Sequence, residues 1–387
     1  MTQPSELYIH IPFCVRKCAY CDFVSYPGQT DFLPAYLDAL ILEARREAEK
    51  LRHPAVDTVF IGGGTPSLLS PEQIRELFSV LRSEFDIRPD AEITCECNPG
   101  TLTEPLLDTM REAGVNRLSM GAQASQEELL KRIGRIHTWC QVEEGILAAR
   151  KAGFTNLSLD LMFALPGQTV KDVEETVQRA LALPLTHLSC YSLIVEEGTP
   201  LEKMVADGQW TLPDEDTERD MHAAALRLLK EAGFERYEIS NYARPGFECR
   251  HNLGYWAGVP YLGLGCAAHS MLPCDPLLGA YLRRGNTPDL HGYVDRVNRN
   301  ESPADETEYI SNYEAIFETM MMGLRTTRGI SEADFLLRHG IPLRQAYGEQ
   351  LRRFTDSGMV VWEDGHVRLS EKGIDFENTV LVELMDD

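Results

Sequence analysis

The 387-residue sequence predicts an α/β fold, in which a partial (β/α)6 barrel is followed by a smaller, winged-helix-like α+β module. Two observations predict the barrel. Short β-branched or apolar runs alternate with longer amphipathic runs, and several amphipathic runs end at a glycine, as helices commonly do. A third observation, a change in composition near residue 273, predicts the second module.

Six apolar runs have the length and composition of buried strands, and each is followed by a run with helical periodicity. Six βα units are too few for a closed eightfold barrel and fit an open or partial one. The expected strands are Leu7–Ile11, Thr58–Ile61, Glu92–Cys97, Arg117–Met120, Leu157–Leu161 and His187–Leu193. The expected helices are Leu33–Leu51, Pro71–Phe85, Glu104–Ala113, Gln141–Ala152, Val170–Leu183 and Asp214–Ala232.

The last quarter of the chain has a different pattern. Proline, glycine, asparagine and acidic residues gather near residues 273–308 with little periodicity, so we expect a linker there. The predicted division is a barrel domain at 1–272, a linker at 273–304 and a module at 305–387. In the module we expect helices at Asn312–Leu324, Glu332–His339 and Leu343–Ser357, and a hairpin formed by Met359–Trp362 and His366–Leu369.

The charge of the chain excludes one class of partner. Asp and Glu number 60 against 37 Lys and Arg, a formal net charge of −23, which opposes a sequence-independent grip on phosphate backbones. The expected winged module is itself acidic, with 17 acidic and 8 basic side chains in residues 305–387. We therefore expect no nucleic-acid partner for either part of the chain.

Localisation follows from apolar runs and charge near the start. No window approaches the roughly 18 to 20 apolar residues that span a bilayer, and acidic Glu6 stands where a signal peptide would carry basic charge. We expect a cytoplasmic protein without a transmembrane segment, and leave open a peripheral association with the inner face of the membrane.

Three of the ten cysteines are clustered, in a C-x3-C-x2-C array of Cys14, Cys18 and Cys21 directly after the first expected strand. Soft thiolates at this spacing suit an iron–sulfur cluster or zinc. A structural zinc site usually has four ligands, so three cysteines leave one corner of the metal site open. For the other seven cysteines we expect the role of small buried apolar residues.

The cysteine array and its position resemble the signature of the radical S-adenosylmethionine (SAM) superfamily. Nearly the whole chain resembles the branch with oxygen-independent coproporphyrinogen III dehydrogenases (HemN type) and heme chaperones (HemW type). The resemblance implies a radical SAM barrel in which Cys14, Cys18 and Cys21 hold a [4Fe–4S] cluster. The fourth iron would bind SAM, and one electron from the cluster could cleave it to a 5′-deoxyadenosyl radical.

Polar residues stand at the ends of successive expected strands, and a Gly62-Gly63-Gly64-Thr65 segment follows the second. Glycines let the backbone approach a ligand closely, and turned-in amides suit the amino-acid end of SAM. From the residues alone, each could be an ordinary polar strand end. The resemblance implies that SAM is lined by Tyr8, Gly63, Gly64, Thr65, Glu96, Gln123, Arg135 and Asp160.

The string Arg250-His251-Asn252-Leu253-Gly254-Tyr255-Trp256 follows the sixth unit. A neutral imidazole can ligate heme iron, and aromatic rings can cover a porphyrin face. From the residues alone, His251 is as well explained as a structural histidine. The string is similar to the heme-binding motif of HemW-type proteins, which implies that His251, Tyr255 and Trp256 bind heme. Because heme is anionic, we expect basic residues nearby, with Arg250, Arg244 and Arg236 as candidates.

The leading hypothesis is a heme chaperone that delivers heme to hemoproteins. An oxygen-independent coproporphyrinogen III dehydrogenase is the alternative, but that family's array continues to a fourth cysteine where this chain has Phe23, and it carries a longer N-terminal extension. A zinc-bound structural protein is the third. Catalytic residues are not assigned, and enzymatic activity stays open. The expected partners are heme, recipient hemoproteins and an electron donor of unknown identity. A homodimer is left open.

Overall fold

The computed structural model describes residues 3–374 and 376–385, and its main feature is a mixed sheet of twelve strands. Seven neighbouring strands at the centre run parallel, and they include all six strands that the sequence predicts. In sheet order the parallel strands are β11 (Tyr261–Leu264), β1 (Glu6–Ile11), β4 (Ala55–Gly63), β5 (Asp86–Cys97), β6 (Arg117–Gln123), β7 (Asn156–Phe163) and β8 (His187–Ser192). The barrel is therefore open, as expected.

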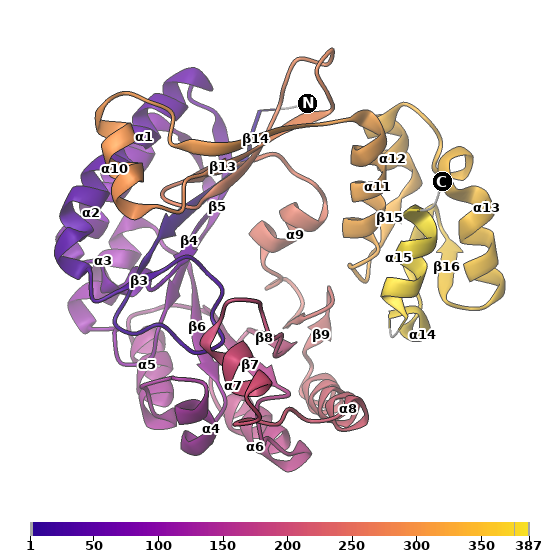
Figure 1. The fold of residues 1–387 in the computed structure, drawn as a ribbon, viewed down its shortest axis with the longest axis horizontal. Helices are drawn as coiled ribbons and strands as arrows, with labels where there is room; N and C mark the ends of the chain where they lie inside the picture. The colour runs from indigo at the N-terminus through magenta and orange to yellow at the C-terminus, as the bar shows by residue number, and fades with distance from the viewer. Residues whose placement is uncertain (1–2, 375, 386–387) are drawn as a thin grey trace.

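Helices cover the outer face of this sheet (Figure 1). Strand β1 shows how the two faces differ, because Leu7, Ile9 and Ile11 join the core under the helices while Tyr8 and His10 alternate with them. Apolar side chains thus pack against helices, and polar ones line the inner face where a ligand can sit. The covering helices are α1 (Leu33–Lys50), α2 (Pro71–Glu84), α3 (Glu104–Ala113), α5 (Trp139–Lys151), α6 (Val170–Leu181) and α8 (Glu215–Glu231). Two short helices, α4 (Glu127–Arg132) and α7 (Pro200–Ala206), pack instead in a separate cluster with Ala19 of the cysteine loop.

The structure differs from the linker expected at residues 273–304. Strands β12 (His269–Leu272), β13 (Tyr281–Asn286) and β14 (Ala304–Ile310) pair antiparallel and continue the sheet beyond β11, and α10 (Leu290–Asn298) lies between the last two. The sequence pattern did not predict strand β14, because most of its residues are exposed and three are acidic, so it has the composition of a loop. At the other edge the sheet ends with β10 (Asn241–Ala243) and β9 (Glu235–Arg236).

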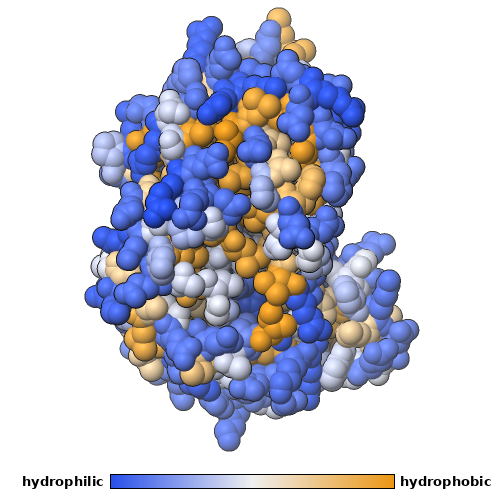
Figure 2. Space-filling model, turned by 90° about the vertical axis from the view of Figure 1, so that its left-hand side faces the viewer, coloured by the Kyte–Doolittle hydropathy of each residue, from blue (hydrophilic) through white to orange (hydrophobic). Residues whose placement is uncertain are grey.

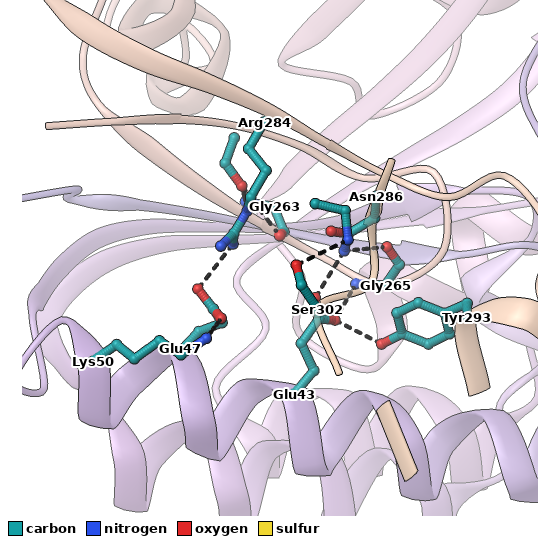
Figure 3. Close-up of polar contacts among 11 residues, drawn as sticks. Glu43, Glu47, Lys50, Gly263, Gly265, Arg284, Asn286, Tyr293 and Ser302 are labelled. Atoms are coloured by element: carbon teal, nitrogen blue, oxygen red, sulfur yellow. Dashed lines mark hydrogen bonds and ion pairs between the residues drawn. The ribbon is translucent and has the colours of Figure 1, made fainter. Parts of the chain in front are cut away.

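A buried carboxylate attaches this antiparallel extension to α1 (Figure 3). Glu43 accepts hydrogen bonds from the Gly265 amide at 2.8 Å, the Asn286 side chain at 2.7 Å and the Tyr293 hydroxyl at 2.6 Å. Burial raises the pKa of Glu43, and the three donors oppose that rise. A carboxylate that is satisfied by three separate segments fixes their relative positions.

The C-terminal module has its own core and a three-stranded sheet in the order β15–β17–β16. The antiparallel hairpin of β16 and β17 follows the helices, which confirms the winged-helix-like expectation. Figure 1 shows the module beside the open barrel, beyond α9 (Arg250–Trp256). Its elements are α11 (Asn312–Gly323), β15 (Ile330–Ser331), α12 (Glu332–His339), α13 (Leu343–Asp356), β16 (Val360–Glu363), β17 (His366–Leu369), α14 (Glu371–Ile374) and α15 (Glu377–Met385).

The surface is mostly hydrophilic, in keeping with the charge of the chain. Figure 2 shows the side formed by α1, α2 and α10, where hydrophilic side chains surround apolar ones near the middle of the face. In residues 3–374 and 376–385, none of the helices combines the length and the apolarity needed to cross a membrane.

Candidate functional site

The cysteine array lies in a loop at the carboxyl end of β1. Cys14 ends the short strand β2 (Phe13–Cys14), which pairs with β3 (Tyr26–Pro27), and the loop between them carries Cys18 and Cys21. The Ala19 amide donates to the Ile133 carbonyl at 2.9 Å, which attaches the loop to the turn after α4. The sheet therefore presents all three thiols at the end where parallel sheets usually bind ligands.

The three thiols are only partly exposed and sit among polar neighbours. The Thr65 hydroxyl donates to Cys14 Sγ at 3.5 Å, and the Arg135 guanidinium lies 3.8 Å from Cys18 Sγ. Burial raises the pKa of the Cys14 thiol, and it raises that of Cys21 to about 11. A metal would have to displace these protons, because the thiolate is the ligand.

Over the described part of the chain, no three His, Cys, Asp or Glu side chains are arranged as the ligands of a metal ion. Soft thiolates suit an iron–sulfur cluster or zinc, and either would have to draw the three thiols of this loop together.

Arg135 joins the cysteine loop to the ends of β5 and β6. Besides its contact with Cys18, its guanidinium donates to the Asn98 side chain at 2.9 Å, to the Gly121 carbonyl and to His137 Nδ1 at 3.2 Å. The arginine is thus fixed from four directions and stays charged next to the thiols. Such a preorganised cation suits the carboxylate of an amino acid.

Arg135→Gln is expected to weaken SAM binding by tenfold or more in reconstituted protein. The glutamine amide can still donate a hydrogen bond, but it lacks the positive charge and the paired N–H groups of the guanidinium. Equilibrium dialysis with labelled SAM measures this. Arg75→Gln on the exposed face of α2 is the matched control and should bind normally. Unchanged SAM affinity in Arg135→Gln would remove this residue from the site.

The glycine segment after β4 is packed more tightly than the sequence indicated. The Gly63 amide donates to Glu96 at 3.1 Å, while the Gly64 and Thr65 amides donate to the Ile11 and Phe13 carbonyls. A Cβ on Gly63 would lie 2.4 Å from the His10 ring, so only glycine fits there. These amides already have partners, so a contact of this segment with SAM would use carbonyl oxygens or the Thr65 hydroxyl.

Three further residues expected at the SAM site lie on the inner face. Asp160 accepts from the Ser119 hydroxyl at 3.1 Å, and Gln123 accepts from the Tyr191 hydroxyl at 3.3 Å. Burial, followed by repulsion from Asp160, raises the pKa of Glu96 to about 7. Two carboxylates close enough to repel each other favour a ligand with hydroxyl or ammonium donors.

Tyr8 and two residues that sequence reasoning missed complete the site. The Tyr8 hydroxyl lies 2.9 Å from His10 Nδ1, and the other His10 nitrogen lies 2.9 Å from the Val24 carbonyl in the cysteine loop. Asn98 donates to the Thr65 hydroxyl at 2.7 Å and accepts from Arg135. The sequence shows His10 as a polar residue in the first expected strand and Asn98 directly after the third. Their role depends on contacts between strands, which the sequence does not show.

The motif with His251 forms α9, and His251 is only 1% exposed. The Thr58 hydroxyl lies 2.7 Å from its Nδ1, and the Tyr255 hydroxyl lies 3.0 Å from its Nε2. Burial, helped by the Arg117 charge, lowers the pKa of His251 to about 3, so the ring is neutral. Tyr255 and Trp256 are half-buried.

The α9 motif and the cysteine array lie toward opposite ends of the strands. Glu92 accepts from the amides of Arg250 and His251, and Glu6 packs against Gly254, where a Cβ would lie 1.8 Å from the carboxylate. Glu6 begins β1, whereas Cys14 follows its end, a separation of roughly 26 Å along extended chain. The expected heme residues therefore lie toward the other end of the strands from the cysteines. They do approach one expected SAM residue, because the Phe60 ring centre lies 5.2 Å from that of His251 and 6.3 Å from that of Tyr8.

Glu6 makes the docking of α9 sensitive to pH. Burial raises the pKa of Glu6 from 4.5 to about 9, so its favourable contribution is complete below pH 4.5 and is lost as the pH rises toward 9. Glu6→Gln should therefore gain stability relative to the wild type over this range, by at most about 1.4 kcal/mol per pH unit. Urea denaturation at several pH values measures the difference, which should be absent for the exposed control Glu127→Gln. A difference that does not vary with pH would contradict the expectation.

The arginines expected near the heme motif bind backbone carbonyls instead. Arg250 donates to Asp90, Arg244 to Leu185 and Ala232, and Arg236 to Glu238 and Ile239. Arg244 also stacks on the Phe234 ring, 4.6 Å from its centre. Arg250 is itself the first residue of α9, so one of the three expected cations lies on the motif.

Comparisons with known proteins agree with this architecture. Residues 8–180 match the model of the Radical SAM superfamily, and residues 310–376 match that of the HemN C-terminal domain. Similar proteins named heme chaperone HemW occur in Bacillus subtilis (37% identity over 95% of each chain) and Lactococcus lactis (35% over 100% of this chain and 99% of that one). One occurs in Escherichia coli K12 (34%, 98% and 97%).

Among solved structures, coproporphyrinogen III oxidase (HemN) from Escherichia coli superposes with a TM-score of 0.84. It is 24% identical, and the match covers 99% of this chain and 90% of that one, which establishes a common fold. The fold and the cysteine site define a radical SAM protein. Within that superfamily, the chain belongs to the HemW family.

The superfamily implies a [4Fe–4S] cluster and SAM, and the residues present fit both. Three partly exposed thiols at the carboxyl end of β1 suit a cluster with one open iron. Beside them, a fixed arginine and two half-buried carboxylates, Glu96 and Asp160, offer partners for the carboxylate, ammonium and hydroxyl groups of SAM.

Proposed function

We propose that this protein is a heme chaperone, which binds heme and delivers it to hemoproteins. The observation that carries the proposal is the His251, Tyr255 and Trp256 motif on α9, in a chain that matches proteins named heme chaperone HemW over nearly its whole length. A porphyrin needs apolar rings for its face and a neutral nitrogen for its iron. The three side chains supply both.

Heme coordination by His251 would require a local rearrangement. Its Nε2 is the nitrogen nearer the half-buried Tyr255, whereas Nδ1 faces buried Thr58. Release of the Tyr255 hydroxyl is therefore the smaller change, because one neutral hydrogen bond contributes only about 1 kcal/mol. His251 would then hold the iron, and Tyr255 and Trp256 would cover the ring.

The cluster residues would act at the other end of the sheet. Cys14, Cys18 and Cys21 would hold the cluster, and SAM would be lined by Tyr8, Gly63, Gly64, Thr65, Glu96, Gln123, Arg135 and Asp160. Bound there, cluster and SAM would supply one-electron chemistry. The protein's own part is to fix the loop through Arg135 and His10 and to orient SAM with charged groups.

An electron donor is the remaining partner of this proposal. Arg16 and Lys17 are exposed in the cysteine loop, and neither is paired with a carboxylate among the described residues. A basic pair beside the cluster favours an acidic one-electron carrier. The proposed function requires neither a homodimer nor contact with a membrane.

The alternative, a coproporphyrinogen III dehydrogenase, has less support. The structural likeness to that enzyme concerns the fold, and Phe23, which is 67% exposed, cannot replace the fourth cysteine of its array. The proposal is tested by heme transfer. Heme-loaded protein mixed with an apo-globin should give the globin spectrum faster than free heme released by an unrelated heme-binding protein. Equal rates would count against a chaperone.

A further inference from the structure

The C-terminal module reaches the end of the heme motif through one arginine. Arg338 on α12 donates to the Gly258 carbonyl at 2.6 Å, two residues beyond Trp256. A Cβ on Gly258 would lie 2.6 Å from Arg338 Nη1, so the guanidinium rests directly on this turn. In the described ranges, no carboxylate lies within ion-pair distance of Arg338, and Asp334, one turn earlier on α12, is the carboxylate whose charge acts on it.

A second arginine of the module lies on the same side of α9. The Arg325 guanidinium is 5.9 Å from the centre of the Trp256 ring. Its Nε is paired with Glu377 at 2.6 Å, so less of its charge is available than that of Arg338. Figure 1 shows α9 between the sheet and this module.

Heme combines an apolar plane with two propionate carboxylates, and a chain of net charge −23 must offset their charge locally. Guanidinium groups bind carboxylates through paired, charge-assisted hydrogen bonds. Resting on the proposed function, we infer that the heme site is composite: Arg338 of the C-terminal module binds a propionate of heme held at Trp256 and Tyr255. Arg325 is the secondary cation.

A titration of full-length protein with hemin and with hemin dimethyl ester tests this site. The ester keeps the ring and the iron but lacks the carboxylates. The wild type should bind hemin more tightly than the ester. Arg338→Gln should weaken hemin binding about tenfold and leave ester binding unchanged, and Arg338→Lys should recover part of the loss. Arg352→Gln on α13, at the outer edge of the module in Figure 1, is the matched control and should match the wild type.

The outcomes separate this inference from the proposed function. If Arg338→Gln binds hemin with the wild-type affinity, or weakens hemin and ester equally, Arg338 only caps α9 and the propionate assignment is overturned. If the wild type binds neither ligand, the heme function itself fails, and the composite site fails with it.

Discussion

Cys18→Ser is expected to yield colourless protein after anaerobic reconstitution with iron and sulfide. Cys18 lies at the middle of the array, and Arg135 lies 3.8 Å from its sulfur, so it joins the loop to the SAM residues. A serine oxygen is a hard, weakly acidic ligand that iron–sulfur clusters bind poorly. Iron content should fall from about four per chain to well below one, and visible absorbance should disappear.

Cys140→Ser is the matched control for this loss. Cys140 is exposed on α5 and its thiol donates to Glu144 on the same helix, so its removal should leave iron and colour unchanged. Metal analysis also tests the zinc alternative. Wild-type protein that reconstitutes with one zinc and no iron would contradict the cluster assignment, whatever the colour of the variant.

His251→Ala is expected to weaken hemin binding by at least tenfold, because no imidazole remains on α9 to ligate the iron. Tyr255→Phe should bind hemin at least as well as the wild type, since it frees Nε2 and keeps the aromatic face. Optical titration of the Soret band measures both affinities. The two variants separate iron ligation from ring packing. His251→Ala removes the imidazole of the His251–Tyr255 hydrogen bond, whereas Tyr255→Phe removes only its hydroxyl.

His291→Ala controls for a general loss of histidine. His291 is exposed at the start of α10 and packs on Phe32, on the opposite side of the sheet from α9. Wild-type affinity in His251→Ala, together with folded protein by circular dichroism, would show that His251 is a structural residue held by Thr58 and Tyr255.

The sequence was sufficient for the parallel half of the fold. Alternation of apolar runs and helical periodicity located β1, β4, β5, β6, β7 and β8, because buried parallel strands carry continuous apolar side chains. The same logic failed for β14, whose sequence Ala-Asp-Glu-Thr-Glu-Tyr-Ile faces solvent. It is held as a strand by backbone pairing with β13, which leaves no periodic signal in the sequence.

The candidate site was also predictable only in part from the sequence. The placement of Cys14, Cys18 and Cys21 in one loop after β1 was predictable, because the three lie within eight residues of sequence. The surroundings of His251 were not, because they depend on Thr58 and Glu92 from two other strands. Arg338 was also beyond prediction, since it approaches Gly258 across 80 residues of chain.

The central claim is that this radical SAM protein carries heme and does not decarboxylate porphyrinogen. One reconstituted sample, supplied with SAM and a reductant, tests it when hemin titration and coproporphyrinogen III consumption are measured side by side. We predict saturable, stoichiometric hemin binding with no consumption of the porphyrinogen. Turnover of coproporphyrinogen III without stoichiometric hemin binding would contradict the claim and establish the enzyme in its place.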